Sequence, residues 1–289
     1  MRFATVEYKG KTFVGVVDKA GETVTALAAS DGAVVIDMHD VIRNQGKFGA
    51  TGEKIALSAV KLKAPIPLPL RNIMCVGKNY TEHAKEFTAS GFDSSASSAA
   101  DAIPTAPIIF TKVPQSVIGP GEAILYPTGV SEQLDYEAEL AVIIGKGGRG
   151  IPLASTMDHV WGYTIVNDVT ARDLQAKHKQ WFLGKSMDTF APMGPFWATA
   201  DEVDLKTSGI KCWVNGELRQ DAKFSDLIFD VPTLIATISA GITLMPGDII
   251  ATGTPVGVGI GFKPPKFLKK GDVIAMEVGG IGRLANHVA

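Results

Sequence analysis

Cysteine is scarce in this chain, which argues against a disulfide framework. Only Cys75 and Cys212 occur among 289 residues, far apart and without Cys-x-x-Cys spacing. This usage favours two reduced, buried thiols in a cytosolic protein. The first residues, MRFATVEYKGKTF, carry scattered charges instead of the apolar core of a signal peptide. We therefore expect a cytoplasmic location.

An excess of one charge and a long apolar run are also absent. The 28 basic and 30 acidic residues leave a net charge of −2, so nothing marks a surface for nucleic acid or an anionic membrane. The most apolar stretch, PTLIATISAGITLMPG, contains Thr, Ser, Gly and Pro and is unsuited to span a bilayer. We expect neither nucleic acid nor a membrane as a partner.

Prolines divide the chain near residue 65. Alternating apolar residues broken at Lys9-Gly10 and again near Gly21 predict hairpins in the first 60 residues. The stretch KAPIPLPLRNIM follows, and its prolines suit neither a helix nor a central strand. We therefore expect a small N-terminal β-rich domain at 1–65 and a larger domain at 71–289.

The larger domain is predicted to be a β-rich α+β domain. A short strand ends at Gly77, and from residue 107 onward apolar strand patterns dominate. Asn215-Gly216, between CWV and ELR, is a strong hairpin signal. Helices are expected from about Tyr80 and at 155–160, 170–178 and 231–241.

The apolar stretch LDYEAELAVIIG carries two acidic residues, Glu137 and Glu139, with Asp135 two positions before them. Residues i and i+2 of a strand share a face, roughly 6.5–7 Å apart. If that face is buried, one carboxylate must take up a proton or a cation must lie between them. Oxygen ligands favour Mg²⁺, Mn²⁺ or Ca²⁺; the alternative is a solvated charged face.

Two further charged residues suit the same site. Asp168 ends the next strand, WGYTIVND, and is placed to act as a third ligand. Lys185 lies in WFLGKSMDTFAPMGP, whose glycines and prolines indicate a loop. A lysine beside a metal can bind an anionic substrate or stabilise an enolate; otherwise it is an ordinary surface lysine.

His83 and Glu86 stand at i and i+3 on the expected helix and share a face. A histidine oriented by a carboxylate is a candidate general base for water, the alternative being a surface ion pair. The segment that follows, 88–106, is rich in Ser, Ala and Gly. It is either a lid or a solvated loop.

Gly253 and Thr254 follow a strand in DIIATGTPVGVG. Backbone N–H groups and a hydroxyl at this position can hold a substrate carboxylate. The alternative is a glycine-rich turn that binds no ligand.

The stretch GKGGRG, at 145–150, matches a dinucleotide-binding pattern, with Asp168 about 20 residues further on. The context disagrees, because Gly150 precedes Ile-Pro-Leu and the helix is expected to start only at Ser155. The preceding strand also carries two acidic residues. We therefore do not expect a nicotinamide or flavin cofactor.

Several motifs together resemble the fumarylacetoacetate hydrolase family. They are VGKNYTEHAKE, LDYEAELAVIIGKGGRGI, GYTIVNDVTARDLQ, WFLGKSMDTFAPMGP, VNGELRQ, LMPGDIIATGTPVGVG and FKPPKFLKKGDVI. They cover about 71–289 in the family's order. The first 65 residues look like the small, variable N-terminal domain of longer bacterial members and of the mitochondrial domain-containing-2 proteins.

The resemblance implies a catalytic domain built on a rolled, mixed β-sheet, a homodimer, and Mg²⁺ or Mn²⁺ in the site. Each expected site residue matches a family position. Glu137, Glu139 and Asp168 match the metal ligands, Lys185 the active-site lysine, His83 and Glu86 the water-activating dyad on the lid helix, and Gln175, Thr254 and Lys112 the substrate contacts, with Gly253 beside Thr254.

The implied activity is hydrolysis of a carbon–carbon bond in a small 2,4-dioxo acid of the acylpyruvate type, through a metal-bound enolate, as in aromatic catabolism. The same site permits oxaloacetate decarboxylation, or keto–enol tautomerisation or isomerisation, because relatives divide among these reactions. A hypothesis of another class is a metal-binding scaffold without catalysis.

Overall fold

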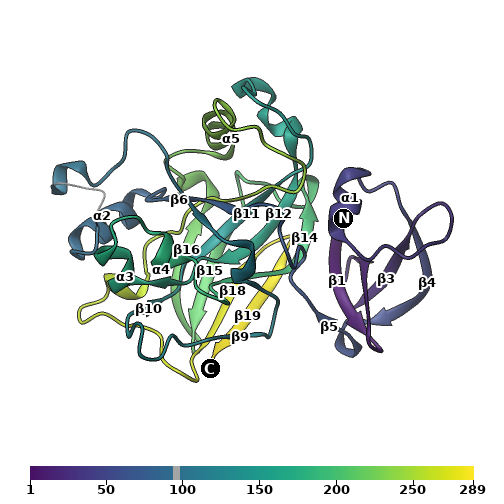
Figure 1. Ribbon diagram of the computed structural model, residues 1–289, viewed down its shortest axis with the longest axis horizontal. Helices are drawn as coiled ribbons and strands as arrows, with labels where there is room; N and C mark the ends of the chain where they lie inside the picture. Colours follow the sequence, from purple (N-terminus) through teal and green to yellow (C-terminus); the bar gives the residue numbers. More distant parts are fainter. Residues whose placement is uncertain (94–97) are drawn as a thin grey trace.

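The structure is a computed structural model that describes residues 1–93 and 98–289 (Figure 1). The N-terminal region, purple in Figure 1, lies beside a larger body that contains the rest of the chain. Part of the expected lid segment, residues 94–97, lies outside the described residues. None of the helices in the described part of the chain is both long and apolar enough to cross a membrane.

Five strands and one helix make up most of the N-terminal region. They are β1 (Arg2–Tyr8), β2 (Lys11–Val17), β3 (Thr23–Ala28), α1 (Met38–Arg43), β4 (Gly49–Ala56) and β5 (Lys61–Leu62), with the 3₁₀ turn η1 (Leu57–Ala59). The hairpin predicted at Lys9-Gly10 is confirmed, because both residues have positive φ, 49° and 73°, between paired strands β1 and β2.

The N-terminal strands do not form a separate sheet. Phe3 of β1 pairs with Trp197 of β14 (Ala191–Thr199), and their rings lie 5.7 Å apart. The order β4-β3-β2-β1-β14-β12-β11-β17-β6-β7 runs through both parts of the chain. The N-terminal region therefore extends the central sheet at the edge furthest from β6 and β7.

The central strands position the polar residues. They are β6 (Ile73–Gly77), β7 (Ile108–Lys112), β8 (Val117–Ile118), β11 (Ala138–Ile144), β12 (Val160–Asn167), β14 and β17 (Ile249–Ala251). All seven residues of β11 are buried, because it lies between β12 and β17 with packed side chains on both faces. Glu139 lies in this strand and Glu137 directly precedes it, and both are buried.

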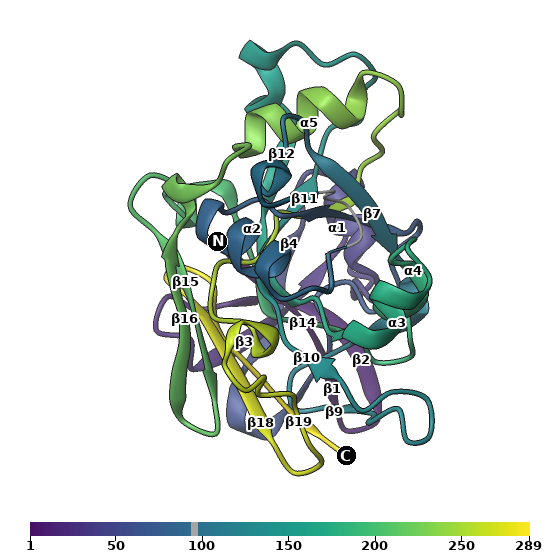
Figure 2. The same ribbon diagram turned by 90° about the vertical axis from the view of Figure 1, so that its left-hand side faces the viewer.

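A second sheet packs against the first. Its order is β16 (Glu217–Lys223), β15 (Gly209–Val214), β18 (Val273–Val278), β19 (Gly282–Val288) and β9 (Ala123–Ile124), and a short pair joins β10 (Leu134–Asp135) to β13 (Thr170–Ala171). Figure 2 shows β15, β16, β18 and β19 together on one side of the molecule. The predicted turn at Asn215-Gly216 is confirmed, with φ of 52° and 82°.

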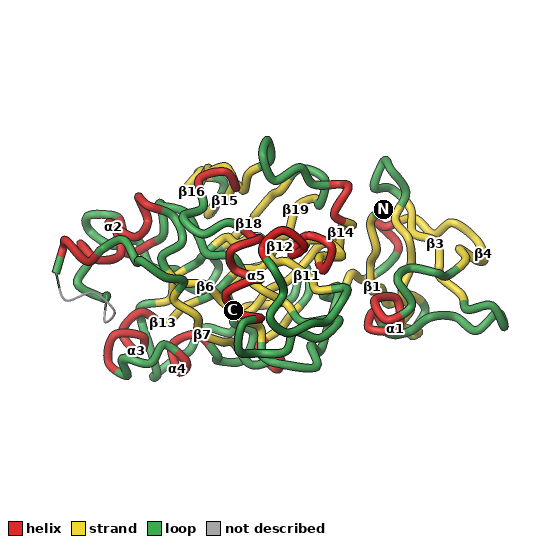
Figure 3. Tube along the Cα trace, turned by 90° about the horizontal axis from the view of Figure 1, so that it is seen from above, coloured by secondary structure: helices red, strands yellow, loops and turns green. Residues whose placement is uncertain are grey.

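The helices are short and lie outside the sheets. They are α2 (Thr81–Ala89), α3 (Arg172–Lys177), α4 (Phe182–Lys185) and α5 (Val231–Ser239), with 3₁₀ turns η2 (Ala99–Asp101), η3 (Pro114–Ser116), η4 (Leu153–His159), η5 (Ala200–Glu202), η6 (Phe224–Asp226) and η7 (Gly259–Gly261). The helix expected to start at Ser155 is instead the 3₁₀ turn η4, which begins after Pro152. Helices α2, α3 and α4 gather at the end opposite the N-terminal region (Figure 3).

The β-rich α+β class with a mixed sheet is thus confirmed. The main core lies between the two sheets, where residues of β11 such as Leu140 and Val142 pack with residues of β18 such as Met276. The polar residues described next lie at the end of this core that α2, α3 and α4 cover.

Candidate active site

Three buried carboxylates converge where β11 begins and β12 ends. The strands are antiparallel, with Ala138 opposite Asn167, so Asp168 lies beside Glu137, and its N–H donates to the Glu137 carbonyl over 2.9 Å. One oxygen from each of Glu137, Glu139 and Asp168 lies within 4.8 Å of the others. The three side chains therefore form a group able to hold a metal ion, as the strand pattern predicted.

The charges of this cluster are unevenly compensated. Burial, with the carboxylates of Asp168 and Glu137, raises the pKa of Glu139 well above its ordinary value. Burial also acts to raise the pKa of Glu137. The nearby cations Lys185 and Arg172 outweigh this effect and lower the pKa of Glu137 to about 2. Without a further cation, Glu139 therefore keeps its proton to a higher pH than an ordinary glutamate does.

Lys185, at the end of α4, is buried and not a surface lysine. Its Nζ donates to Oε2 of Glu137 and Oδ2 of Asp168, each over 2.8 Å. Burial opposes the charge of the ammonium, but these two carboxylates raise its pKa. Lys185 thus lies within the carboxylate cluster as a cation.

Lys112, at the end of β7, is also fully buried, but behind Asp168. Its Nζ lies 2.6 Å from Oδ1 of Asp168 and also donates to the carbonyls of Val169 and Lys185. In this structure it is absent from the cavity lining, so its contacts support Asp168 from inside the protein.

The family motifs did not lead us to Arg172, yet it is central to the site. Its Nη1 lies 2.6 Å from Oε1 of Glu137, and the same atom donates to Oε1 of Gln175 over 3.1 Å. Its Nη2 is buried without a hydrogen-bond partner. The signal available in the sequence was the spacing in RDLQ, which places Arg172 three residues before Gln175 on one helix face.

His83 and Glu86 of α2 form the expected pair, and His83 is buried. Nδ1 of His83 lies 3.3 Å from Oε2 of Glu86. A carboxylate only accepts, so Nδ1 carries a proton, and in the neutral form of the ring Nε2 then has the lone pair. The arrangement suits a proton-transferring histidine and differs from a solvated surface pair.

Gly253 and Thr254 follow β17 and contact protein groups. The N–H of Gly253 donates to Oε2 of Glu139 over 2.9 Å, and Oγ1 of Thr254 accepts from Nε2 of Gln220 over 2.8 Å. Gly253 thus orients one carboxylate of the cluster, while Thr254 lines the cavity beside it.

The cavity at the cluster is small. Its lining combines polar and charged side chains with aromatic rings, and it includes His83, Phe87, Phe110, Gln175, Trp181 and Thr254. Its volume is about 10 Å³, which is room for about one water molecule. Trp181 packs edge-on against Phe87 and Phe110, so aromatic rings close the side nearest α2.

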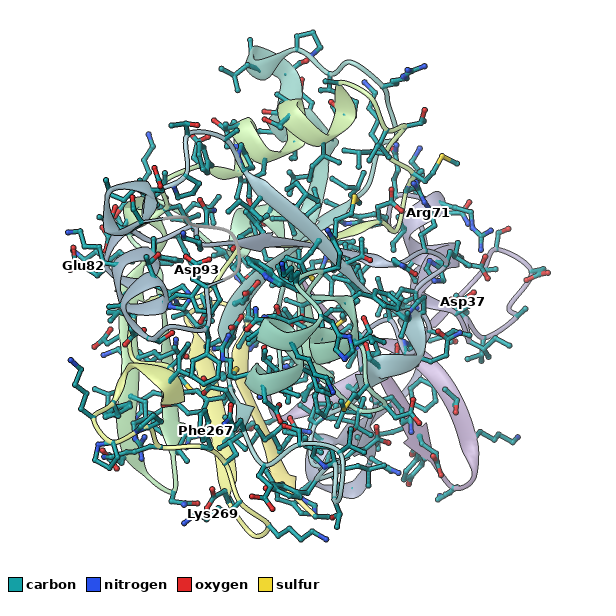
Figure 4. The ribbon with its side chains drawn as sticks, turned by 60° about the vertical axis from the view of Figure 1, so that its left-hand side comes forward. Asp37, Arg71, Glu82, Asp93, Phe267 and Lys269 are labelled. Carbon is teal, nitrogen blue, oxygen red and sulfur yellow. The ribbon has the colours of Figure 1, made fainter. Side chains whose placement is uncertain are left out.

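A buried ion pair fixes the end of α2 beside this cavity. Nζ of Lys78 lies 2.7 Å from Oδ2 of Asp93, and both side chains are 2% exposed. Asp93 also accepts from Thr88 of α2 over 2.6 Å. In Figure 4, Asp93 lies inward of Glu82, which is at the outer side of the molecule.

Comparison with known proteins agrees with this fold and site. The family model "Fumarylacetoacetate (FAA) hydrolase C-terminal" matches residues 72–289, and the model "Rv2993c-like, N-terminal" matches residues 1–65. The chain therefore belongs to the fumarylacetoacetate hydrolase family, an enzyme family, as its motifs predicted.

The relatives include two proteins named as tautomerases. The chain is 44% identical over 314 residues to oxaloacetate tautomerase YisK of Bacillus subtilis, covering 100% of both chains. It is 42% identical over 234 residues to human mitochondrial oxaloacetate tautomerase FAHD2A, covering 80% of this chain and 70% of the relative. These similarities agree with the domain-containing-2-like branch that the motifs indicated.

A solved structure supports the whole architecture. Fumarylacetoacetate hydrolase from the psychrophilic Exiguobacterium antarcticum superposes with a TM-score of 0.85 at 39% sequence identity. The match covers 100% of this chain and 99% of that one. The N-terminal region is thus included in the similarity.

Proposed function

We propose that this protein is a divalent-metal-dependent tautomerase that interconverts the enol and keto forms of a small 2-oxo acid, with oxaloacetate as the favoured substrate. The similarity to the oxaloacetate tautomerase of Bacillus subtilis over the full length of both chains carries the proposal. It supports the tautomerase alternative better than the carbon–carbon hydrolysis first expected from the motifs.

The residues present fit Mg²⁺ or Mn²⁺. Three buried carboxylates converge, and the pKa of one of them, Glu139, is raised by burial and by the other two when no further cation is present. Hard oxygen donors of this kind suit these two ions. When bound, the ion supplies Lewis acidity and a binding point for the oxygens of a 2-oxo acid.

Proton transfer is assigned to His83. In ketonisation Nε2 takes the hydroxyl proton of the enol and then delivers a proton to C3, while Glu86 holds the Nδ1 proton and so fixes the ring orientation. Lys185 donates from Nζ toward the C2 oxygen, where negative charge develops during the transfer. The O–H bond breaks, a C3–H bond forms, and the double bond moves from C2–C3 to C2–O, while no carbon–carbon or carbon–oxygen σ bond is made or broken.

The small volume of the cavity favours this reaction over hydrolysis. The cavity of about 10 Å³ must open to admit substrate, and the substrate then fills the space among Phe87, Phe110 and Trp181. Tautomerisation needs no second reactant, whereas hydrolysis also needs a placed water. Hydrolysis of an acylpyruvate remains the second candidate, since the His83–Glu86 pair also suits activation of water.

Product analysis tests the proposal. Purified protein with Mn²⁺ is given enol-oxaloacetate, oxaloacetate and acetylpyruvate separately. Loss of enol absorbance faster than in buffer, without pyruvate, supports tautomerisation. Acetate with pyruvate identifies a hydrolase, carbon dioxide with pyruvate a decarboxylase, and metal binding without any turnover a scaffold; each of these overturns the proposal. His83→Ala should reduce tautomerisation by roughly 10²–10⁴-fold.

A further inference from the structure

Asp135 is the third acidic residue of LDYEAELAVIIG, and it does not join the carboxylate cluster. It is fully buried, in the short strand β10. Oδ1 accepts from the N–H groups of Tyr136 and Gly259 over 2.9 and 2.6 Å. Oδ2 accepts from Nε of Arg172 and the N–H of Ile260 over 2.9 and 3.1 Å. Four donors thus hold one carboxylate between two parts of the site.

One part is the carboxylate cluster. The Arg172 guanidinium that donates to Asp135 through Nε reaches Glu137 through Nη1 over 2.6 Å. A guanidinium is planar and rigid, so fixing Nε also fixes the direction of Nη1. The position of Asp135 therefore determines where Arg172 meets Glu137.

The other part is the glycine-rich segment 255–262, which holds Glu86. The N–H of Gly257 lies 3.2 and 3.3 Å from the two oxygens of Glu86. The hydroxyl of Tyr136 donates to the Gly257 carbonyl over 2.7 Å. A Cβ at Gly261 would overlap the Glu86 carboxyl group, so Glu86 packs directly on this segment.

We propose that Asp135 is a positioning residue that couples the carboxylate cluster to the His83–Glu86 pair. Gly259 and Ile260 place segment 255–262, that segment places Glu86, and Glu86 orients His83. The same carboxylate positions Arg172, which contacts Glu137. Asp135 therefore positions both the groups that transfer the proton and the groups that bind the substrate. The inference rests on the proposed function, because it assigns proton transfer to His83.

Asp135→Asn is the direct perturbation. An asparagine places an NH₂ group against two donors, since both oxygens of Asp135 only accept here, and it removes the negative charge beside Arg172. Segment 255–262 then loses its anchor while Glu86 and His83 keep their own side chains. Asp248→Asn is the matched control, because Asp248 is also buried and accepts from Arg71 and a backbone N–H, but contacts neither part of the site.

A double-mutant cycle with Glu86→Gln distinguishes positioning from a general structural role. We expect Asp135→Asn to lower kcat for enol-oxaloacetate at least tenfold, with KM and the Kd for Mn²⁺ changed less than threefold. In the Glu86→Gln background the same change should lower kcat less than twofold. Equal losses in both backgrounds, unchanged kcat, or a loss explained by weaker Mn²⁺ binding would overturn the proposal. Asp248→Asn should leave kcat unchanged, and a similar loss there would also overturn it.

A measurement without turnover separates this inference from the proposed function. The ¹⁵N shifts of the His83 ring report its tautomer, and we expect the Nδ1–H form in the wild type and a mixture in Asp135→Asn. An unchanged tautomer would contradict the inference even if the protein is a tautomerase. A changed tautomer supports it even if another reaction is catalysed.

If Asp135→Asn fails to fold, Gly261→Ala tests the same linkage from its other end. The added Cβ meets the flexible end of Glu86. We expect the same loss of kcat, again absent in the Glu86→Gln background, and the same mixed tautomer of His83. Full activity of Gly261→Ala would show that segment 255–262 does not set the position of Glu86.

Discussion

Nζ of Lys185 lies 2.8 Å from Oε2 of Glu137. An ammonium thus bonds an oxygen of the same group that is proposed to hold the divalent ion. The lysine neutralises part of the cluster when no ion is bound, and it also lines the cavity that the proposed substrate would occupy. Lys185 is therefore expected to weaken binding of the ion but to assist turnover.

Lys185→Met should separate them. We expect kcat to fall by about 10²–10³-fold, because a charged donor near the developing negative charge is lost. The apparent affinity for Mn²⁺ should rise, because Glu137 and Asp168 no longer bond the ammonium. Calorimetric titration and steady-state kinetics measure the two effects. Lys85→Met, at an exposed lysine of α2, is the control, and weaker Mn²⁺ binding in Lys185→Met would contradict the competition.

Glu137→Gln with Glu139→Gln should abolish both Mn²⁺ binding and turnover while the protein stays folded. In the wild type, an ion at 100 times its Kd should stabilise the fold by about 2.7 kcal/mol. The stabilisation is measured as a rise in melting temperature on adding Mn²⁺. This rise should be absent from the double variant and present in Glu82→Gln, a solvent-exposed control on α2. Metal-dependent stabilisation of the double variant would place the ion elsewhere.

Local patterns predicted much of the fold and part of the candidate site. The turns at Lys9-Gly10 and Asn215-Gly216 depend on residues that tolerate positive φ, which is a local property. The spacing of Glu137 and Glu139 likewise requires only the period of a strand. The pairing of Phe3 with Trp197 joins distant parts of the chain, and no local pattern reveals it.

The same limit applies to the polar residues. RDLQ carries charges that suit a solvated helix, and only tertiary packing shows that Arg172 is buried between Asp135 and Glu137. Residue types indicated that Gly253 belongs near the site, and the family resemblance indicated the same for Lys112. Their partners, Glu139 and Asp168, depend on how the strands meet.

Stability of the metal-free protein should depend on pH through Glu139. Its pKa is raised in the folded state, by burial and by Asp168 and Glu137, above the ordinary value of 4.5. As pH rises past that value the unfolded chain releases this proton first, so the unfolded state binds fewer protons and stability falls. The contribution of Glu139 to stability is complete below its pKa in the unfolded chain, and it is lost as pH rises through its raised pKa in the folded protein.

Melting temperatures with EDTA and with Mn²⁺ measure this loss, with Glu139→Gln as the control that lacks this carboxyl group. Mn²⁺ should remove the dependence, because bound Glu139 is ionised. Below the raised pKa, each ion displaces one proton, and the apparent Kd should improve about tenfold per pH unit. A Kd independent of pH would mean that Glu139 is already ionised in the metal-free protein. Glu137 acts in the opposite direction, since its contribution is lost as pH falls from 4.5 to about 2.

Arg172→Lys tests whether geometry or charge matters at this position. Lysine keeps the charge, but one ammonium cannot reproduce the separate contacts of Nε with Asp135 and of Nη1 with Glu137. We expect kcat/KM to fall about 100-fold, a loss near 2.7 kcal/mol in transition-state stabilisation, with Mn²⁺ still bound. Lys177→Arg is the control. It exchanges lysine for arginine on the same helix, at a residue outside the cavity lining. Near-normal kcat/KM in Arg172→Lys would show that a positive charge alone is sufficient beside Glu137.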